Sequence, residues 1–218
     1  MTRPRKQAAV FFTDDVFGNP DYNTQKCYVS RSARITGEVI LEDDVIVCPQ
    51  VVLRADEGAP FKICKGTNIQ DGVIMHGLHK KYVEDEAGRK YSVLIGSHST
   101  IAHGAIIHGP AKIGKKTFIG FRAIIHNSQV GRNCHIGHGT IVENVIIVDE
   151  RYARSGSVID SQALADALPK VEEKHKEFNH EVVDYNKQLR AKYHARRVFL
   201  DKLAAKGKLT HNKNTVKT

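Results

Sequence analysis

Three histidines lie in aliphatic stretches of the chain: His76 in "NIQDGVIMHG", and His103 and His108 in "TIAHGAIIHGP". Three neutral imidazoles that converge would bind a divalent metal and leave one coordination position open for water. The interval of five between His103 and His108 fits neither the i, i+4 spacing of one helix face nor the period of two of one strand face. Whether the three histidines form one site therefore depends on the fold.

Aliphatic residues recur every six positions along most of the sequence. The predicted rungs of this repeat are Val29, Ile35, Leu41, Val47, Leu53, Ile63, Ile69, Met75, Ile95, Ile101, Ile107, Ile113, Ile119, Ile125, Val130, Ile136, Val142 and Val148. A hexapeptide period is typical of a parallel β-helix, in which three short strands make each triangular coil. Eighteen rungs predict an all-β solenoid of about six coils over residues 28–160. The period does not fix the handedness of the coil.

The register of the repeat assigns each histidine to a face. His76 and His108 each follow a rung by one residue, and their rungs are three apart, so we expect them to stack on one face with backbones about 4.8 Å apart. His103 follows its rung by two residues and belongs to a different face. A neighbouring chain around a threefold axis could bring the two faces together, so the pattern predicts a homotrimer with metals at its interfaces.

Other polar residues fall at equivalent positions of the repeat. Arg54 lies on the face of His76 and His108, and Asp71 lies one coil before His103. We therefore expect Arg54 and Asp71 to face each other across the same interface, with Gln70 on the His103 face. The remaining histidines that follow or precede rungs are interpreted as outward residues without a role: His98, His126, His135 and His138.

Residues 54–62 interrupt the register briefly, and four other segments depart from the repeat. Residues 1–27 are predicted to be an N-terminal cap segment, and residues 77–92 a polar loop. Residues 161–205 are predicted to form helices, because "SQALADAL" precedes Pro169 and a helical stripe of Phe178, Val182, Leu189 and Tyr193 follows. The longer helix is expected to lie along the solenoid. Residues 206–218 are predicted to be a disordered basic tail.

The net charge of +9 is concentrated at the C-terminal end, where residues 170–218 hold 13 Lys and Arg against 6 Asp and Glu. We interpret this end mainly as a solvated helix face, with an acidic protein partner as an alternative and nucleic acid as an unlikely one. No apolar run is long enough to span a membrane, and no signal peptide is recognisable, so a cytoplasmic location is expected. The four cysteines form no CxxC pair and are expected to be buried thiols.

The motifs "RADEGAPF", "NIQDGVIMHGL", "YSVLIG", "IAHGAIIHGPAKIG" and "FIGFRA" resemble the γ-class carbonic anhydrases. The similar branch contains the archaeal enzyme and the N-terminal domain of the carboxysome scaffold protein. The resemblance implies a left-handed β-helix, a homotrimer, and a zinc centre shared between subunits, with Fe2+ or Co2+ as alternatives. It also makes the carboxysome lumen an alternative location, and carboxysome proteins candidate partners of the basic C-terminal end.

The resemblance implies a role for each matching residue. His76, His103 and His108 match the metal ligands. Arg54 and Asp71 match an interface ion pair, with Asp56 beside them. Glu57 and Gln70 match polar residues near the metal-bound water, and Asn186 matches an asparagine of the C-terminal helix. His79 stands where the archaeal enzyme has an acidic proton shuttle, so we expect it to pass protons to buffer.

The expected reaction is the reversible hydration of carbon dioxide to bicarbonate and a proton by a metal-bound hydroxide. Two other function classes stay open. One is a catalytically silent scaffold or bicarbonate-binding trimer of the carboxysome type. The other is a hexapeptide acyltransferase, which is less favoured because such an enzyme has no need of three convergent histidines beside an arginine–aspartate pair.

Overall fold

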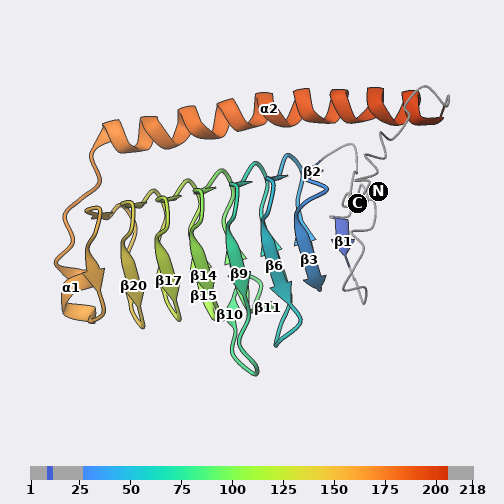
Figure 1. Cartoon of the computed structure of the whole chain (residues 1–218). Helices are drawn as coiled ribbons and strands as arrows, with labels where there is room; N and C mark the ends of the chain where they lie inside the picture. Colours follow the sequence, from blue (N-terminus) through green and yellow to red (C-terminus); the bar gives the residue numbers. More distant parts are fainter. Residues whose placement is uncertain (1–8, 12–26, 206–218) are drawn as a thin grey trace, which may run out of the picture.

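A computed structural model describes residues 9–11 and 27–205 of the 218-residue chain. Its main body is a parallel β-solenoid with three sheets of seven strands each, which makes about seven turns (Figure 1). Every pairing within the three sheets is parallel except that of β1 with β4. The fold class predicted from the hexapeptide period is therefore confirmed.

The strands of each sheet follow one another at intervals of three along the chain, except where the hairpin strands β10 (Val83–Glu84) and β11 (Lys90–Tyr91) intervene. Sheet A contains β1 (Ala9–Phe11), β4 (Val39–Leu41), β7 (Phe61–Ile63), β12 (Val93–Ile95), β15 (Ala111–Ile113), β18 (Gln129–Val130) and β21 (Ile146–Ile147). Sheet B contains β2 (Tyr28–Val29), β5 (Ile46–Val47), β8 (Asn68–Ile69), β13 (Thr100–Ile101), β16 (Phe118–Ile119), β19 (His135–Ile136) and β22 (Tyr152–Ala153). Sheet C contains β3 (Arg34–Gly37), β6 (Val52–Ala55), β9 (Ile74–His76), β14 (Ile106–His108), β17 (Ile124–His126), β20 (Ile141–Glu143) and β23 (Val158–Ile159).

All the predicted rung residues except the last form the continuous core, because each points into the coil and is buried between the rungs above and below it. The prediction of Val148 as the last rung is wrong, because Val148 is 48% exposed and its neighbour Ile147 is buried in its place. The step from Val142 to Ile147 is five residues, which repeats the step from Ile125 to Val130. The buried rung positions then continue to Ala153 and Ile159, which adds a seventh coil. The sequence pattern missed this coil because Ala153 is too small to stand out as a rung.

Segment 77–92 is an ordered hairpin and not simply a polar loop. Strands β10 (Val83–Glu84) and β11 (Lys90–Tyr91) pair in antiparallel fashion, and the Asp85 carboxylate accepts hydrogen bonds from the backbone N–H groups of Ala87 and Arg89. Val83 and Tyr91 pack with Leu94 in a small cluster outside the main core. The hairpin projects away from the long helix (Figure 1).

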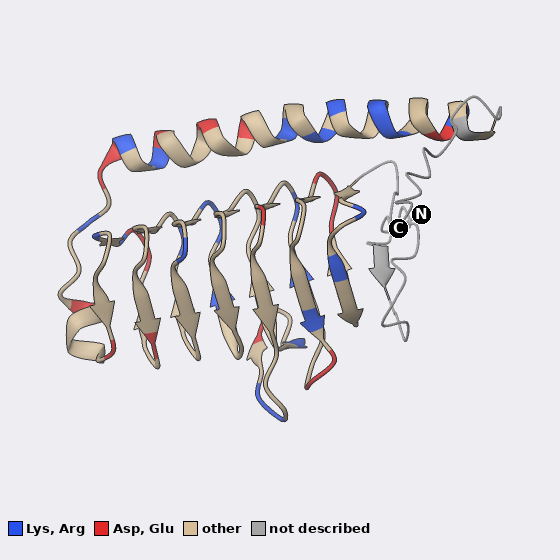
Figure 2. Cartoon of the chain, viewed as in Figure 1, with Lys and Arg blue, Asp and Glu red and all other residues tan. Residues whose placement is uncertain are grey.

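Two helices follow the solenoid. The short helix α1 (Gln162–Asp166) begins after the N-cap Ser161, and α2 (Glu173–Ala205) runs for 33 residues along sheet B, parallel to the solenoid axis (Figure 1). The α2 side chains buried against the sheet are Asn179, Val183 and Asn186, whereas Phe178 and Tyr193 of the predicted stripe stay partly exposed beside them. Among the charged residues of the C-terminal half of α2, Lys and Arg predominate (Figure 2).

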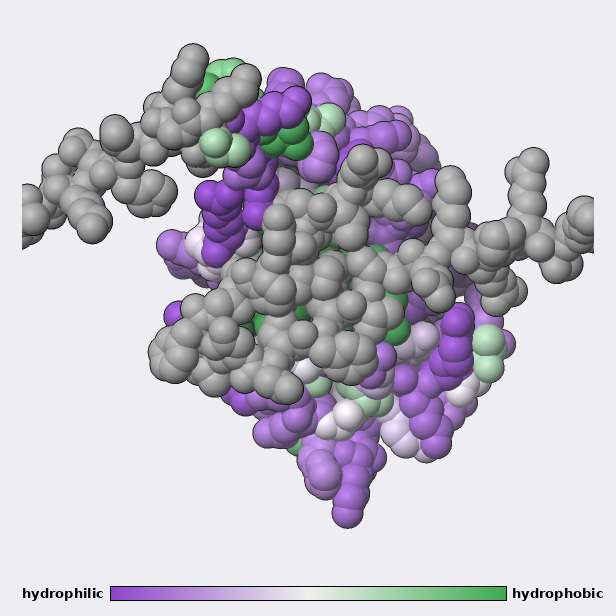
Figure 3. Space-filling model, turned by 90° about the vertical axis from the view of Figure 1, so that its right-hand side faces the viewer, coloured by the Kyte–Doolittle hydropathy of each residue, from purple (hydrophilic) through white to green (hydrophobic). Residues whose placement is uncertain are grey.

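The surface of the solenoid is largely hydrophilic around its rim when it is viewed from its N-terminal end (Figure 3). Within the described ranges no helix is long and apolar enough to cross a membrane. The four cysteines are free thiols; Cys27, Cys48 and Cys134 are buried, as predicted, whereas Cys64 is only half-buried. The predicted cap segment, apart from β1 and Cys27, and the predicted tail at 206–218 lie outside the described residues.

Candidate metal centre

His76 and His108 stack on the outer face of sheet C. They are direct partners in the pairing of β9 with β14, which confirms the stacking predicted from the register. His76 Nδ1 lies 3.4 Å from His108 Nε2, and the ring centroids are 5.2 Å apart. Two imidazoles at this separation can bind one metal, with each nitrogen about 2.0–2.1 Å from the ion.

The surroundings of the two rings leave nitrogens free for a ligand. His108 Nδ1 lies 3.1 Å from the carbonyl oxygen of Gly109; because a carbonyl can only accept, Nδ1 carries the proton and Nε2 keeps its lone pair. His76 Nε2 is buried and has no hydrogen-bond partner. The nearest acid is Glu57, whose Oε1 is 3.8 Å away, too far for a hydrogen bond. A buried nitrogen without a partner is uncommon, and a metal ion would satisfy it.

Arg54 is the next residue of the same face, one coil before His76. Its guanidinium donates to Asp56 Oδ2 at 3.0 and 3.3 Å. Burial of Asp56 opposes ionisation, but the hydrogen bond from Arg54 prevails and lowers the pKa of the carboxyl group. Arg54 is exposed enough to meet a second carboxylate from outside the chain.

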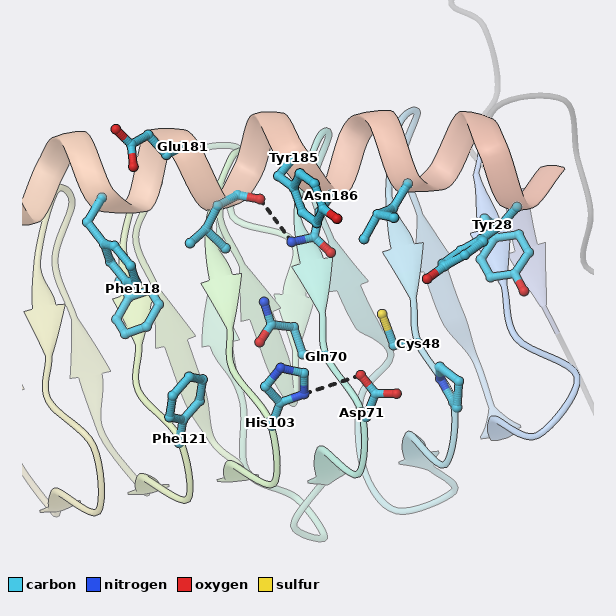
Figure 4. A pocket seen from close by; sticks show the side chains of 15 residues that line it. Tyr28, Cys48, Gln70, Asp71, His103, Phe118, Phe121, Glu181, Tyr185 and Asn186 are labelled. Atoms are coloured by element: carbon cyan, nitrogen blue, oxygen red, sulfur yellow. Dashed lines mark hydrogen bonds and ion pairs between the residues drawn. The ribbon is translucent and has the colours of Figure 1, made fainter. Parts of the chain in front are cut away.

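His103 lies on the turn after β13, on a different face from His76 and His108. His103 Nδ1 is 3.2 Å from Asp71 Oδ2, on the equivalent turn of the preceding coil (Figure 4). A carboxylate at Nδ1 holds the proton there and leaves Nε2 free, which is the usual arrangement of a histidine ligand and its supporting acid. Gly104 closes this turn with a φ of +68°, a conformation that glycine adopts without strain.

Gln70 and Asn186 face the same pocket as His103. This open pocket of about 710 Å3 lies between sheet B and α2, with Phe118 and Phe121 on one wall (Figure 4). Gln70 is 8% exposed; its Nε2 donates to Asn68 Oδ1 at 3.1 Å, and its Oε1 is buried without a partner. The Asn186 amide donates to the carbonyl oxygen of Val182 at 2.9 Å.

One chain does not bring all the predicted site residues together. His76, His108, Glu57, Arg54 and Asp56 form a sheet C half-site, whereas His103, Asp71, Gln70 and Asn186 form a pocket half-site. Among the described residues no group of three or more histidine, cysteine or acidic side chains could hold a metal within one chain. His79 lies outside both half-sites, in an exposed turn after β9.

Two histidines that the sequence left without a role have specific surroundings. His126 extends the sheet C face by one coil beyond His108 and lies 3.1 Å from Glu143 Oε1 through its Nδ1. The register could have identified this pair, since both residues follow a rung by one. His135 points out of the coil but is not exposed: it is 8% exposed beneath α2, where it stacks on Phe118 and contacts His175. Burial lowers the pKa of His135 to about 4, and His175 and His138 add to this effect.

Comparison with known proteins gives three kinds of similarity. The family described as bacterial transferase hexapeptide (six repeats) matches residues 110–144. The carboxysome assembly protein CcmM of Nostoc sp. is 40% identical over 169 residues, which cover 78% of this chain and 30% of that protein. The carbonic anhydrase of Methanosarcina thermophila is 39% identical over 153 residues, or 66% of this chain and 62% of that protein. The chain thus spans less than two thirds of either relative.

A solved structure of a hexapeptide transferase family protein from Anaplasma phagocytophilum superposes with a TM-score of 0.61 at 18% identity, over 78% of this chain and 90% of that one. This likeness concerns the fold alone. The chain is therefore a hexapeptide-repeat β-solenoid protein. Within that class it is similar to γ-class carbonic anhydrase and to CcmM, which confirms the resemblance seen in its motifs.

Proposed function

We propose that the chain forms a homotrimer in which the sheet C half-site of one subunit meets the pocket half-site of the next. Each half-site lacks ligands that the other supplies, and Arg54 of one would meet Asp71 of the other. The outer face of sheet C also carries an exposed aliphatic column, in which Ile74 is 43%, Ile106 37% and Val158 52% exposed. A neighbouring subunit would cover these side chains.

His76, His108 and the partner's His103 would hold a divalent metal at each interface. Three neutral imidazoles fit zinc, and they also fit Fe2+ or Co2+. The supporting acceptors of His103 and His108, the Asp71 carboxylate and the Gly109 carbonyl, favour the tautomers that a metal requires. The orientation of these ring nitrogens is the single observation that carries the proposal. Surface histidines without a role would not need acceptors that fix their tautomers.

The reaction that fits this site is the hydration of carbon dioxide to bicarbonate and a proton. A metal held by three histidines would lower the pKa of a bound water enough for that water to lose its proton near neutral pH. The unpartnered Oε1 of Gln70 would accept a hydrogen bond and orient the attacking group. Glu57 would accept the released proton beside His76. The exposed His79 would pass this proton to buffer. Asn186 would line the pocket on the side of α2.

Stopped-flow hydration of carbon dioxide by freshly purified protein of measured metal content tests this function. We expect turnover that rises with metal occupancy and falls when a chelator removes the metal. Metal-loaded trimers that do not accelerate hydration would contradict the catalytic assignment.

The similarity to CcmM favours a second candidate function, a scaffold or bicarbonate-binding trimer without turnover. The relatives of this name are described as carboxysome assembly proteins, so a carboxysome location belongs to this candidate. The basic C-terminal half of α2 would then contact an acidic protein partner. A metal-loaded trimer that binds bicarbonate and lacks hydration activity would support this candidate over the enzyme.

A further inference from the structure

Two columns of polar and aromatic residues run along the solenoid, each with one residue per coil. The sheet C column consists of Arg54, His76, His108, His126 and Glu143, which are consecutive partners in the strand pairing of sheet C. The turn column consists of Asp71, His103, Phe121 and His138, on equivalent turns after sheet B. Backbone hydrogen bonds join these turns coil to coil: Gly104 N–H donates to the Asp71 carbonyl, Arg122 N–H to His103 and Gly139 N–H to Phe121.

The proposed trimer fixes how the two columns meet, and the inference rests on that arrangement. The partner's His103 would lie between His76 and His108, and the partner's Asp71, one coil earlier, between Arg54 and His76. Both columns advance by the same strand spacing of about 4.8 Å per coil. One coil further, the partner's Phe121 must lie between His108 and His126. One coil beyond that, the partner's His138 must lie between His126 and Glu143.

The protonation of His138 decides what this second meeting point can bind. The backbone N–H of Phe121 donates to His138 Nδ1 at 3.0 Å, and the ring stacks on Phe121 with centroids 4.3 Å apart. Because Nδ1 accepts, the neutral ring carries its proton on Nε2 and presents a donor to its surroundings. If His138 bound a metal through Nε2, its proton would have to sit on Nδ1. That proton would point at the Phe121 N–H and replace the hydrogen bond between them.

Glu143 offers the matching acceptor. One carboxylate oxygen lies 3.1 Å from His126 Nδ1, and the side chain stays 45% exposed, so a second oxygen is free for a donor from outside the chain. We propose that His138 of one subunit donates through Nε2 to Glu143 of its neighbour, with His126 holding that carboxylate. This contact forms a metal-free polar latch at each subunit interface, two coils beyond the metal site.

Cross-linking with a short bis-maleimide tests the latch in the full-length trimer. The double variant His138→Cys/Glu143→Cys should give covalent trimers on a denaturing gel. The variant Arg54→Cys/Asp71→Cys tests the underlying trimer register. The variant His138→Cys/Arg54→Cys serves as the control, because its positions are more than three coils apart, beyond about 14 Å along the interface. The wild type controls for native thiols.

Cross-links in the first two variants, and not in the control, are the expected result. Cross-links in the Arg54/Asp71 variant alone would overturn the latch and leave the proposed trimer standing. Absence of both would overturn the trimer register and the latch together. A second readout separates a latch from a second metal site: bound metal should stay at one per chain in wild type and in Glu143→Ala, while the trimer of Glu143→Ala dissociates about tenfold more readily. Two metals per chain in the wild type would contradict the latch.

Discussion

His103 and Asp71 lie on equivalent turns of adjacent coils, with His103 Nδ1 3.2 Å from Asp71 Oδ2. The contact joins residues 32 positions apart in the sequence, and it arises because β8 and β13 are partners in sheet B. A carboxylate in this position holds the Nδ1 proton of the imidazole and orients its Nε2. Asp71 is thereby a positioning residue for the histidine that we propose to be shared between subunits.

Removal of this carboxylate should weaken metal binding. In Asp71→Ala the His103 ring loses its partner, and we expect metal affinity to fall about 10- to 100-fold. Competition with a fluorescent chelator measures the affinity. Asp149→Ala is the matched control, because Asp149 forms a comparably exposed pair with Arg132 far from both half-sites. Equal affinities of Asp71→Ala and the wild type would show that Asp71 does not support a ligand.

His79 is expected to carry protons and not to bind metal. His79→Ala should keep its metal and trimer mass, while kcat falls about tenfold or more at low buffer concentration. The ratio kcat/KM should change little, because proton export comes after the hydration step and only regenerates the enzyme for the next turnover. Added imidazole should restore part of the loss, and His180→Ala, an exposed histidine of α2, should behave as wild type. An unchanged kcat would assign the shuttle to Glu57 or Glu84.

The adjacent residues Ile106 and Ile107 should separate core stability from subunit association. Ile107 is fully buried in the coil, whereas Ile106 is 37% exposed on the outer face of sheet C. Ile107→Ala should lower the free energy of unfolding by about 2–5 kcal/mol through the cavity that it leaves. Ile106→Ala should cost far less in unfolding but weaken trimer association. Chemical denaturation and sedimentation equilibrium measure the two effects, and a reversed order would contradict the assignment of these faces.

The buried His135 should make the stability depend on pH. Its pKa is about 4 in the folded chain, against about 6.5 for an ordinary histidine. Between these values the unfolded chain binds the extra proton, so the stabilisation is complete above about pH 6.5 and is lost as pH falls towards 4. The loss amounts to roughly 3 kcal/mol. Denaturation at pH 7 and pH 4.5 should show a smaller difference in His135→Phe than in the wild type; an identical difference would contradict this origin.

The sequence was sufficient to predict the solenoid because each rung is a large aliphatic residue at a fixed interval. It was insufficient where the pattern depends on one side chain: Ala153 is too small to mark a rung, and Val148 competes with Ile147 for the same position. The stacking of His76 on His108 followed from strand register alone. The contact of His135 with His175 could not be predicted, because it depends on how α2 lies against sheet B.

Native mass spectrometry of mixed trimers tests the central claim, a metal site divided between two subunits, most directly. Homotrimers of His76→Ala and of His103→Ala should each lack metal. After subunit exchange, every mixed trimer contains one interface that combines an intact sheet C half-site with an intact pocket half-site, and therefore should bind one metal ion. Mixed trimers without metal, or a metal-loaded wild-type monomer, would contradict the shared site.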